Sequence, residues 1–150
     1  MKNTPRHTYQ ILTKREKIMA DYLKDKILPK NIWLGVTVED KISKNKIDYL
    51  RNIQAYIRFI SMEPLLEDIG KVDLTDIHWV IVGGESGVKA RPMDEEWVLN
   101  IKKQCVKQNS AFFFKQWGAW GSDGVKRSKK ENGRKLNSKI YNEYPELVLS

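Results

Sequence analysis

Short apolar runs alternate with amphipathic segments along most of the chain. Five runs are rich in β-branched and aromatic residues, and they span residues Tyr9–Thr13, 32–38, 57–60, 79–82 and 112–114. Most of them are continuously apolar, which is typical of strands buried on both faces of a parallel sheet. The pattern therefore predicts five strands.

Segments with helical periodicity lie between several of these runs. Residues 15–27 form the first, which ends before Pro29. Its predicted apolar face consists of Ile18, Met19, Tyr22, Leu23 and Ile27. A second helix is predicted with Ser43 as its N-cap, and its inward residues are Ile47, Leu50 and Ile53.

The third helix has the clearest boundaries. Asp94 follows Pro92 and is a good N-cap, and Glu95 and Glu96 suit the positive first turn of a helix. Its predicted buried stripe is Trp97, Val98, Ile101 and Cys105. The connection from residue 61 to residue 79 has less helical character, so we expect a loop with one short turn of helix.

Strands and helices that alternate at this spacing predict βα units. Five strands are too few for a closed barrel of about 250 residues. The predicted fold class is therefore α/β, either a partial βα barrel or an open, mostly parallel sheet of about five strands with flanking helices. The regular pattern stops after Trp120, which divides the chain into a βα domain (residues 1–121) and a basic loop with a C-terminal tail (residues 122–150). Within the tail, residues 136–149 predict a small strand or turn.

The chain carries a net charge of +8, which favours anionic partners such as RNA or DNA. A generally lysine-rich surface would give the same excess. Part of the charge gathers in one glycine-containing stretch, which we interpret as a mobile basic loop that binds a partner. Its candidate residues are Lys126, Arg127, Lys129, Lys130, Arg134 and Lys135.

No apolar run is long enough for a membrane span, and the polar N-terminus does not resemble a secretion signal. The single cysteine allows no intramolecular disulfide and suits a reducing compartment. We therefore expect a cytoplasmic protein without membrane contact.

Polar and charged residues follow each predicted strand. Because function collects at the carboxyl ends of parallel strands, we expect these residues to form one binding face. The candidates are Lys14, Glu39, Ser61, Glu63, Gly83, Gly84, Glu85, Ser86, Arg91, Lys115, Gln116 and Trp117.

Three features of this face allow more than one interpretation. Residues 83–87 would either cradle an anion with free N–H groups or make a tight turn. Trp117 and Trp120 would either stack on a base or cover the core and hold the tail. The third feature is a set of three carboxylates that would bind a metal, work in acid–base chemistry or join a structural ion network with nearby cations. We favour the network, because neither His7 nor His78 is placed for catalysis. The carboxylates are Glu39, Glu63 and Glu85, and the cations are Lys14, Arg91 and Lys115.

Several long motifs resemble the C-terminal half of a phage-associated family of radical-S-adenosylmethionine-like proteins with a three-cysteine motif. They are FISMEPLL (59–66), WVIVGGESG (79–87), ARPM (90–93), FFKQWG (113–118), YQILTKR (9–15) and WLGVTVED (33–40). The resemblance covers residues 5–121 and implies a partial βα barrel. In the family, an N-terminal half carries the cysteines that bind an iron–sulfur cluster.

The cluster segment of that family is missing here. A cluster needs about three thiolates, and Cys105 is the chain's only cysteine and lies on a predicted buried stripe. We therefore expect no catalytic residue, no metal and no cofactor. The leading hypothesis is a non-catalytic, phage-derived binding protein that inhibits a host CRISPR nuclease by covering a protein or protein–RNA surface.

Two other hypotheses stay open. The chain would be half of a radical enzyme that binds S-adenosylmethionine and takes its cluster from a partner chain, or a basic module that binds nucleic acid. The resemblance also implies that the first strand lacks a neighbour, so we expect a homodimer through its exposed edge.

Overall fold

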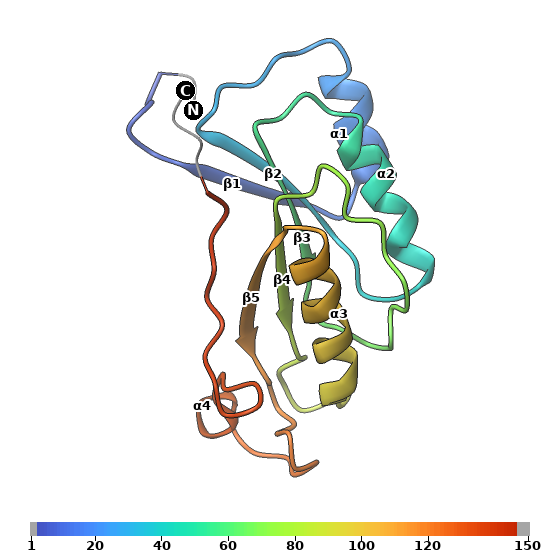
Figure 1. Cartoon of the computed structure of the whole chain (residues 1–150), viewed down its shortest axis with the longest axis vertical. Coiled ribbons are helices and arrows are strands. Elements are labelled where there is room, and N and C mark those ends of the chain that lie inside the picture. The colour runs from blue at the N-terminus through green and yellow to red at the C-terminus, as the bar shows by residue number, and fades with distance from the viewer. Residues whose placement is uncertain (1–2, 147–150) are drawn as a thin grey trace.

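The computed structural model describes residues 3–146 and contains one five-stranded sheet in which every pairing is parallel (Figure 1). The strands follow chain order and are β1 (Tyr9–Thr13), β2 (Ile32–Thr37), β3 (Ile57–Met62), β4 (Trp79–Gly83) and β5 (Ala111–Gln116). The sheet does not close into a barrel. The predicted α/β class with an open parallel sheet is therefore confirmed. The bounds of β1 agree with the prediction, and those of the other strands differ from it by at most two residues.

The connecting helices lie on one face of the sheet (Figure 1). They are α1 (Glu16–Leu23), the 3₁₀ helix η1 (Ile42–Asn45), α2 (Lys46–Arg51) and α3 (Glu95–Lys107), and a short helix α4 (Lys129–Asn132) follows the sheet. Neighbouring parallel strands must be joined by crossover connections, which are almost always right-handed. Because the strands follow one another in chain order across the sheet, right-handed crossovers place all their helices on the same face of the sheet. None of the helices in residues 3–146 has the length and apolar composition that a membrane span requires.

The side chains of the strands divide into two apolar clusters. The larger cluster packs under α1, α2 and α3, and it includes Leu34, Val36, Ile60, Met62, Val80, Val82, Phe112 and Phe114. The smaller cluster lies on the face of the sheet without helices, and its buried members are Trp33, Ile57, Phe59 and Trp79. Both faces are apolar, which explains why the strands show continuous rather than alternating hydrophobicity.

The first helix differs from the prediction. It ends at Leu23 rather than at residue 27, and only part of its predicted apolar face is covered. Met19 and Leu23 pack on the core, whereas Ile18, Tyr22 and Ile27 are 62%, 69% and 80% exposed. The prediction was wrong for these three residues. The helix faces the sheet with Met19 and Leu23, which leaves Ile18 and Tyr22 on the exposed side, and Ile27 lies beyond the end of the helix.

Two further local predictions need correction. Ser43 lies within η1 rather than capping a helix; its N–H donates to Asp40 Oδ1 at 2.8 Å, so Asp40 holds the start of this turn. The connection between β3 and β4 contains no helical turn. It is instead held to the core by buried apolar side chains, namely Leu65, Ile69, Val72, Leu74 and Ile77.

The third helix follows the prediction closely. The Asp94 side chain accepts a hydrogen bond from Glu96 N at 2.9 Å, and Val98, Ile101 and Cys105 are buried. Trp97 is only partly buried and packs against the edge of the core.

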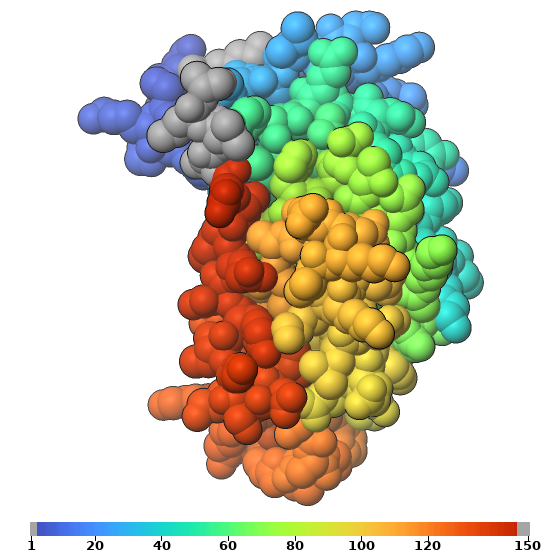
Figure 2. Space-filling view, in the orientation of Figure 1, coloured from blue at the N-terminus to red at the C-terminus, as the bar shows by residue number. Residues whose placement is uncertain are grey.

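The C-terminal segment covers the outer edge of β5. Phe113 pairs with Asn142 in an antiparallel bridge, and Phe114 N donates to Tyr141 O at 2.8 Å. Figure 2 shows this segment, in red, as a ridge beside the flank that carries α3. Leu136 is fully buried in the main core. The antiparallel bridges at Leu136 and Asn142 agree with the small strand or turn predicted for residues 136–149, of which 147–149 lie outside the described residues.

Candidate functional site: strand-end face and basic segment

The carboxyl ends of the strands carry three ion pairs, and each joins a predicted carboxylate to a predicted cation. Lys14 lies 2.7 Å from Glu39, Lys115 lies 3.2 Å from Glu63, and Arg91 lies 2.9 Å from Glu85. The structure thus brings these six residues together as the structural ion network that the sequence favoured. The negative charge of this face is largely compensated within the chain.

Glu85 is the most firmly held of the three carboxylates. Its Oε2 accepts hydrogen bonds from Arg91 N at 2.8 Å and Arg91 Nε at 2.9 Å, and its Oε1 accepts from Arg91 Nη2 at 2.9 Å. These hydrogen bonds lower the pKa of Glu85 from 4.5 to about 2. A carboxylate with such a pKa stays ionised near neutral pH and is a poor general acid or base.

The glycine segment that follows β4 packs backbone against backbone on the loop after β5. A Cβ on Gly84 would lie 1.9 Å from the carbonyl oxygen of Trp117, and a Cβ on Gly118 would lie 2.3 Å from that of Glu85. Gly84 N also donates to Gln116 O at 3.0 Å. Gly84 therefore serves close packing rather than an anion cradle, whereas Ser86 and Gly87 remain exposed.

The two tryptophans after β5 have structural contacts. Trp117 is only 2% exposed, and its Nε1 donates to Lys135 O at 2.7 Å. Trp120 Nε1 donates to Ala90 O at 2.8 Å. Trp117 was therefore wrongly included among the residues that would contact a ligand, because its ring holds the tail on the core. Ser61, Gly83, Gly84 and Gln116 are also buried at this end of the sheet.

The basic segment, residues 126–135, has more structure than its composition predicts. Ser128 and Glu131 form a capping box at the start of α4: Ser128 N donates to Glu131 Oε2 at 3.0 Å, and Glu131 N donates to Ser128 Oγ at 3.3 Å. Arg127 forms an ion pair with Asp123, which neutralises the charge of Arg127 and holds the preceding turn in place. The segment is therefore tied into a defined shape.

A cleft of about 320 Å³ separates the basic segment from the glycine segment. Its lining consists of Ser86, Gly87, Val88, Ala119, Lys126, Arg127, Ser128 and Lys129. Lys126 Nζ crosses the cleft and donates to Val88 O. Lys126 and Lys129 line the cleft and make no ion pair with any residue between 3 and 146, so uncompensated positive charge borders it. Lys130 and Lys135, which lie outside the lining, also make no ion pair with a described residue.

Arg134, the remaining basic candidate, has a different environment. Its guanidinium carbon lies 5.2 Å from the ring centroid of Phe113, and its Nε and Nη2 are buried without a hydrogen-bond partner among the described residues. The side chain therefore packs on the sheet by a cation–π contact instead of pointing into the cleft.

A second hollow, of about 330 Å³, lies on the face of the sheet without helices. The rings of Phe59, Trp79, Phe113 and Tyr144 line it, and Ser61, Glu63 and Lys115 bring its rim to the strand-end face. Tyr144 comes from the tail, with its ring centroid 5.1 Å from that of Trp79. The sequence pattern does not predict this hollow, because continuously apolar strands do not show which alternate residues lack a covering helix.

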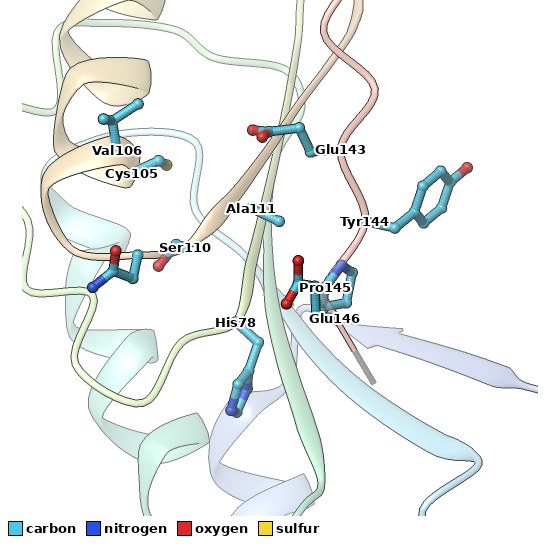
Figure 3. Close-up of a pocket in the computed structure, with 10 residues that line it drawn as sticks. His78, Cys105, Val106, Ser110, Ala111, Glu143, Tyr144, Pro145 and Glu146 are labelled. Carbon is cyan, nitrogen blue, oxygen red and sulfur yellow. The ribbon is translucent and has the colours of Figure 1, made fainter. Parts of the chain in front are cut away.

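A third hollow, of about 490 Å³, lies at the opposite, amino end of the strands (Figure 3). The serine and histidine that line it are already hydrogen-bonded to the backbone. Ser110 Oγ donates to Ile77 O at 2.7 Å, and His78 Nδ1 accepts from Arg58 N at 3.0 Å. Burial raises the pKa of Cys105 to about 12. Figure 3 shows His78 turned away from Cys105 and Glu143, so these groups do not form a nucleophile–base pair.

The donor set does not fit an iron–sulfur cluster. The chain has one cysteine, and that thiol is fully buried in the core and protonated at neutral pH. Between residues 3 and 146, no group of three or more His, Cys, Asp or Glu side chains is arranged to hold a metal ion.

Comparison with protein-family models matches residues 1–145 to one family, described as a protein of unknown function (DUF5131). No curated protein and no solved structure matches the chain.

Proposed function

The chain belongs to the DUF5131 family of proteins of unknown function, and from its own structure we propose that it is a non-catalytic protein that binds a nucleic acid, alone or within a protein–RNA complex. The observation that carries this proposal is the separation of charges at the strand-end face. The carboxylates there form ion pairs within the chain, whereas the lysines that line the cleft form none with residues 3–146.

The shape of the cleft supports a phosphate backbone as its ligand. Lys126 and Lys129 lie on one wall, and the exposed Ser86 and Gly87 lie on the other. Lysines contribute point charges to phosphate binding, and hydroxyl and backbone N–H groups add hydrogen bonds. The capping box at Ser128 fixes the wall that carries the lysines, which limits the entropy lost on binding.

A sharper form of the proposal is inhibition of an RNA-guided CRISPR nuclease in the cytoplasm of a host cell. It rests on the resemblance to a phage-associated family together with a basic surface, since such effectors hold nucleic acid in positively charged channels and expose RNA. The test is a pull-down from a host that carries its native defence systems, with the bound RNA sequenced. Recovery of an effector with its guide RNA would support it, and recovery of bulk RNA alone would reduce the proposal to general nucleic-acid binding.

The binding proposal is tested with a charge-reversed triple variant, Lys126→Glu, Lys129→Glu and Lys130→Glu. Its matched control reverses three exposed lysines on or beside α3, namely Lys71, Lys103 and Lys107. Affinity for labelled single-stranded RNA and DNA is measured by fluorescence anisotropy over a salt series. For every phosphate that the protein no longer neutralises, the salt slope should fall by about 0.7.

We expect the triple variant to lose at least about tenfold in affinity and about two units of salt slope, and the control to lose much less. Equal losses would show that only net charge matters. Wild-type binding without salt dependence would contradict the proposal.

The aromatic hollow favours one alternative, a half-enzyme that binds S-adenosylmethionine and takes its cluster from a partner chain. An adenine ring suits a pocket lined by Phe59 and Trp79, and Glu63 offers a carboxylate to a cationic sulfonium. Calorimetry on this chain decides between the two functions. Saturable binding that Phe59→Ala abolishes would favour the half-enzyme, and no heat of binding would remove it.

A further inference from the structure

The face of the sheet without helices is concave. Leu12 of β1 and Phe113 of β5 line the same hollow of about 330 Å³, although three strands lie between β1 and β5. Neighbouring strands are about 4.8 Å apart, so a flat sheet would hold these two strands about 19 Å apart. The sheet is therefore curved around the hollow.

Two buried rings form the floor of this hollow. Phe59 and Trp79 line it and are only 2% and 3% exposed. The Phe59 ring lies directly on the backbone of β2, because a Cβ on Gly35 would be 2.4 Å from its Cε2 atom. A side chain at residue 35 would push the ring into the hollow, so Gly35 helps to keep the hollow open.

Tyr144 forms the exposed aromatic wall of the hollow. It is 58% exposed, and its ring centroid lies 5.1 Å from that of Trp79 and 5.6 Å from that of Phe113. Trp79 Nε1 also donates to Glu143 O at 2.8 Å, which fixes the tail beside the ring. Figure 3 shows the Tyr144 ring on the side of the tail away from Cys105 of α3. The ring is therefore held in place and is open to a ligand over much of its surface.

The hollow and the basic cleft are neighbours at the end of β5. Lys115 lines the hollow. The next residue is Gln116, whose Nε2 lies 3.5 Å from Ser86 Oγ, and Ser86 lines the cleft. A ligand that reaches from one cavity to the other meets aromatic rings first and uncompensated lysines next. A planar aromatic group beside an anionic group is the chemistry of a nucleotide.

We propose that the hollow takes one unpaired base of a single strand whose phosphates lie in the cleft, which rests on the proposed binding of nucleic acid. Ligand pockets span about 300–1,000 Å³, so this hollow has the size for a small group such as one base with its sugar. Bases of a single strand are free to stack on aromatic side chains, and such stacking depends little on sequence. Bases of a duplex are already stacked and paired. The chain therefore prefers single strands to duplexes, with little preference for sequence.

Modified strands test the stacking without any change in the protein. Fluorescence anisotropy compares a labelled DNA strand, the same strand annealed to its complement, and a strand of equal length whose bases are replaced by abasic sites. The duplex and the abasic strand should each bind about tenfold more weakly than the intact strand. The salt slope of the abasic strand should stay the same, because its phosphates are unchanged.

Substitutions at Tyr144 test the site itself. Tyr144→Leu keeps an apolar contact with Trp79 but removes the π-face, so it should lower affinity for the single strand by about tenfold. Its affinity for the duplex and its salt slope should stay as in the wild type, and Tyr144→Phe should bind normally. Tyr22→Leu is the matched control, since Tyr22 is 69% exposed on α1 and does not line the hollow. Urea unfolding checks that each variant is as stable as the wild type.

The outcomes separate this proposal from the one on which it rests. Equal affinity for the intact strand, the abasic strand and the duplex would overturn the stacking site and leave phosphate binding at the cleft in place. Normal single-strand binding by Tyr144→Leu would also overturn it. A chain that binds none of these nucleic acids would overturn both proposals.

Discussion

Gly84 provides a sharp test of why the segment after β4 is rich in glycine. In a Gly84→Ala variant, the new Cβ would lie 1.9 Å from the carbonyl oxygen of Trp117, whereas real Cβ atoms stay beyond 3.0 Å. The two backbone segments would have to separate by about 1.1 Å. That movement would break the hydrogen bonds from Gly84 N to Gln116 O and from Ala119 N to Glu85 O.

The expected cost combines the two effects. Overpacking in a rigid region costs about 1–3 kcal/mol, and each broken hydrogen bond adds about 1 kcal/mol. We therefore expect Gly84→Ala to lower the free energy of unfolding by at least about 3 kcal/mol. The measurement is urea unfolding followed by circular dichroism. The dependence of the unfolding free energy on urea concentration should be the same for the wild type and Gly84→Ala, which shows that the two proteins unfold alike.

The neighbouring glycine supplies the control. A Cβ on Gly83 would lie 2.7 Å from Glu63 Oε2, which is the mobile end of a side chain and can swing away. Breaking the ion pair between Glu63 and Lys115 costs about 0–1 kcal/mol, and the reduced entropy of the unfolded chain offsets about as much. Gly83→Ala should therefore stay within about 1 kcal/mol of wild type. Equal destabilisation by the two substitutions would refute the explanation from close backbone packing.

Three smaller predictions concern single groups. Asp94→Ala should lower the free energy of unfolding by about 1 kcal/mol by removing the cap on Glu96 N, whereas Asp94→Asn should retain most of it. The pKa of Glu85 is lower in the folded state, so its stabilisation is present above about pH 4.5 and is lost as the pH falls toward 2; acid titration of Glu85→Gln should show a shallower loss of stability there. Burial raises the pKa of Cys105 to about 12, so a thiol reagent at mildly alkaline pH should modify it only after unfolding. Rapid labelling of the native protein would contradict its burial.

The fold was largely predictable because the strongest signals were local. Continuous apolar runs identified all five strands, and Asp94 fixed the start of α3 by direct capping. The predictions that failed depended on tertiary contacts. The apolar face of α1 had the correct periodicity, but periodicity does not say how wide a stripe the sheet covers, and Ile18 and Tyr22 remain exposed.

The sequence predicted which residues lie at the candidate site better than it predicted what each of them does there. Strand order brought Glu39, Glu63 and Glu85 to one end of the sheet, and nearby cations were correctly paired with them. Trp117 was ambiguous because its burial depends on where the tail returns, which is at Lys135, 18 positions later in the chain. The aromatic hollow was hidden for the same reason, since Tyr144 reaches it only through the fold.

The arrangement of charge separates the parts of the strand-end face that maintain the fold from the part that can bind. Two of the rim ion pairs join different segments, as Lys115 does from β5 to Glu63 beyond β3, and the third holds Arg91 to Glu85 within the loop after β4. Altering a rim carboxylate would therefore act mainly through the packing of the loops. The lysines of the basic segment make no ion pair within residues 3–146, and Lys126 alone among them ties two segments, by its hydrogen bond to Val88 O. Reversing the charge of Lys129 and Lys130 should therefore leave the fold intact. The two sheet edges also differ: the tail pairs with β5, whereas no segment within residues 3–146 pairs with the outer edge of β1. Binding through the lysines of the basic segment therefore depends on local charge more than on the fold, so one salt series on the charge-reversed variant and its control can distinguish it from an effect of net charge alone.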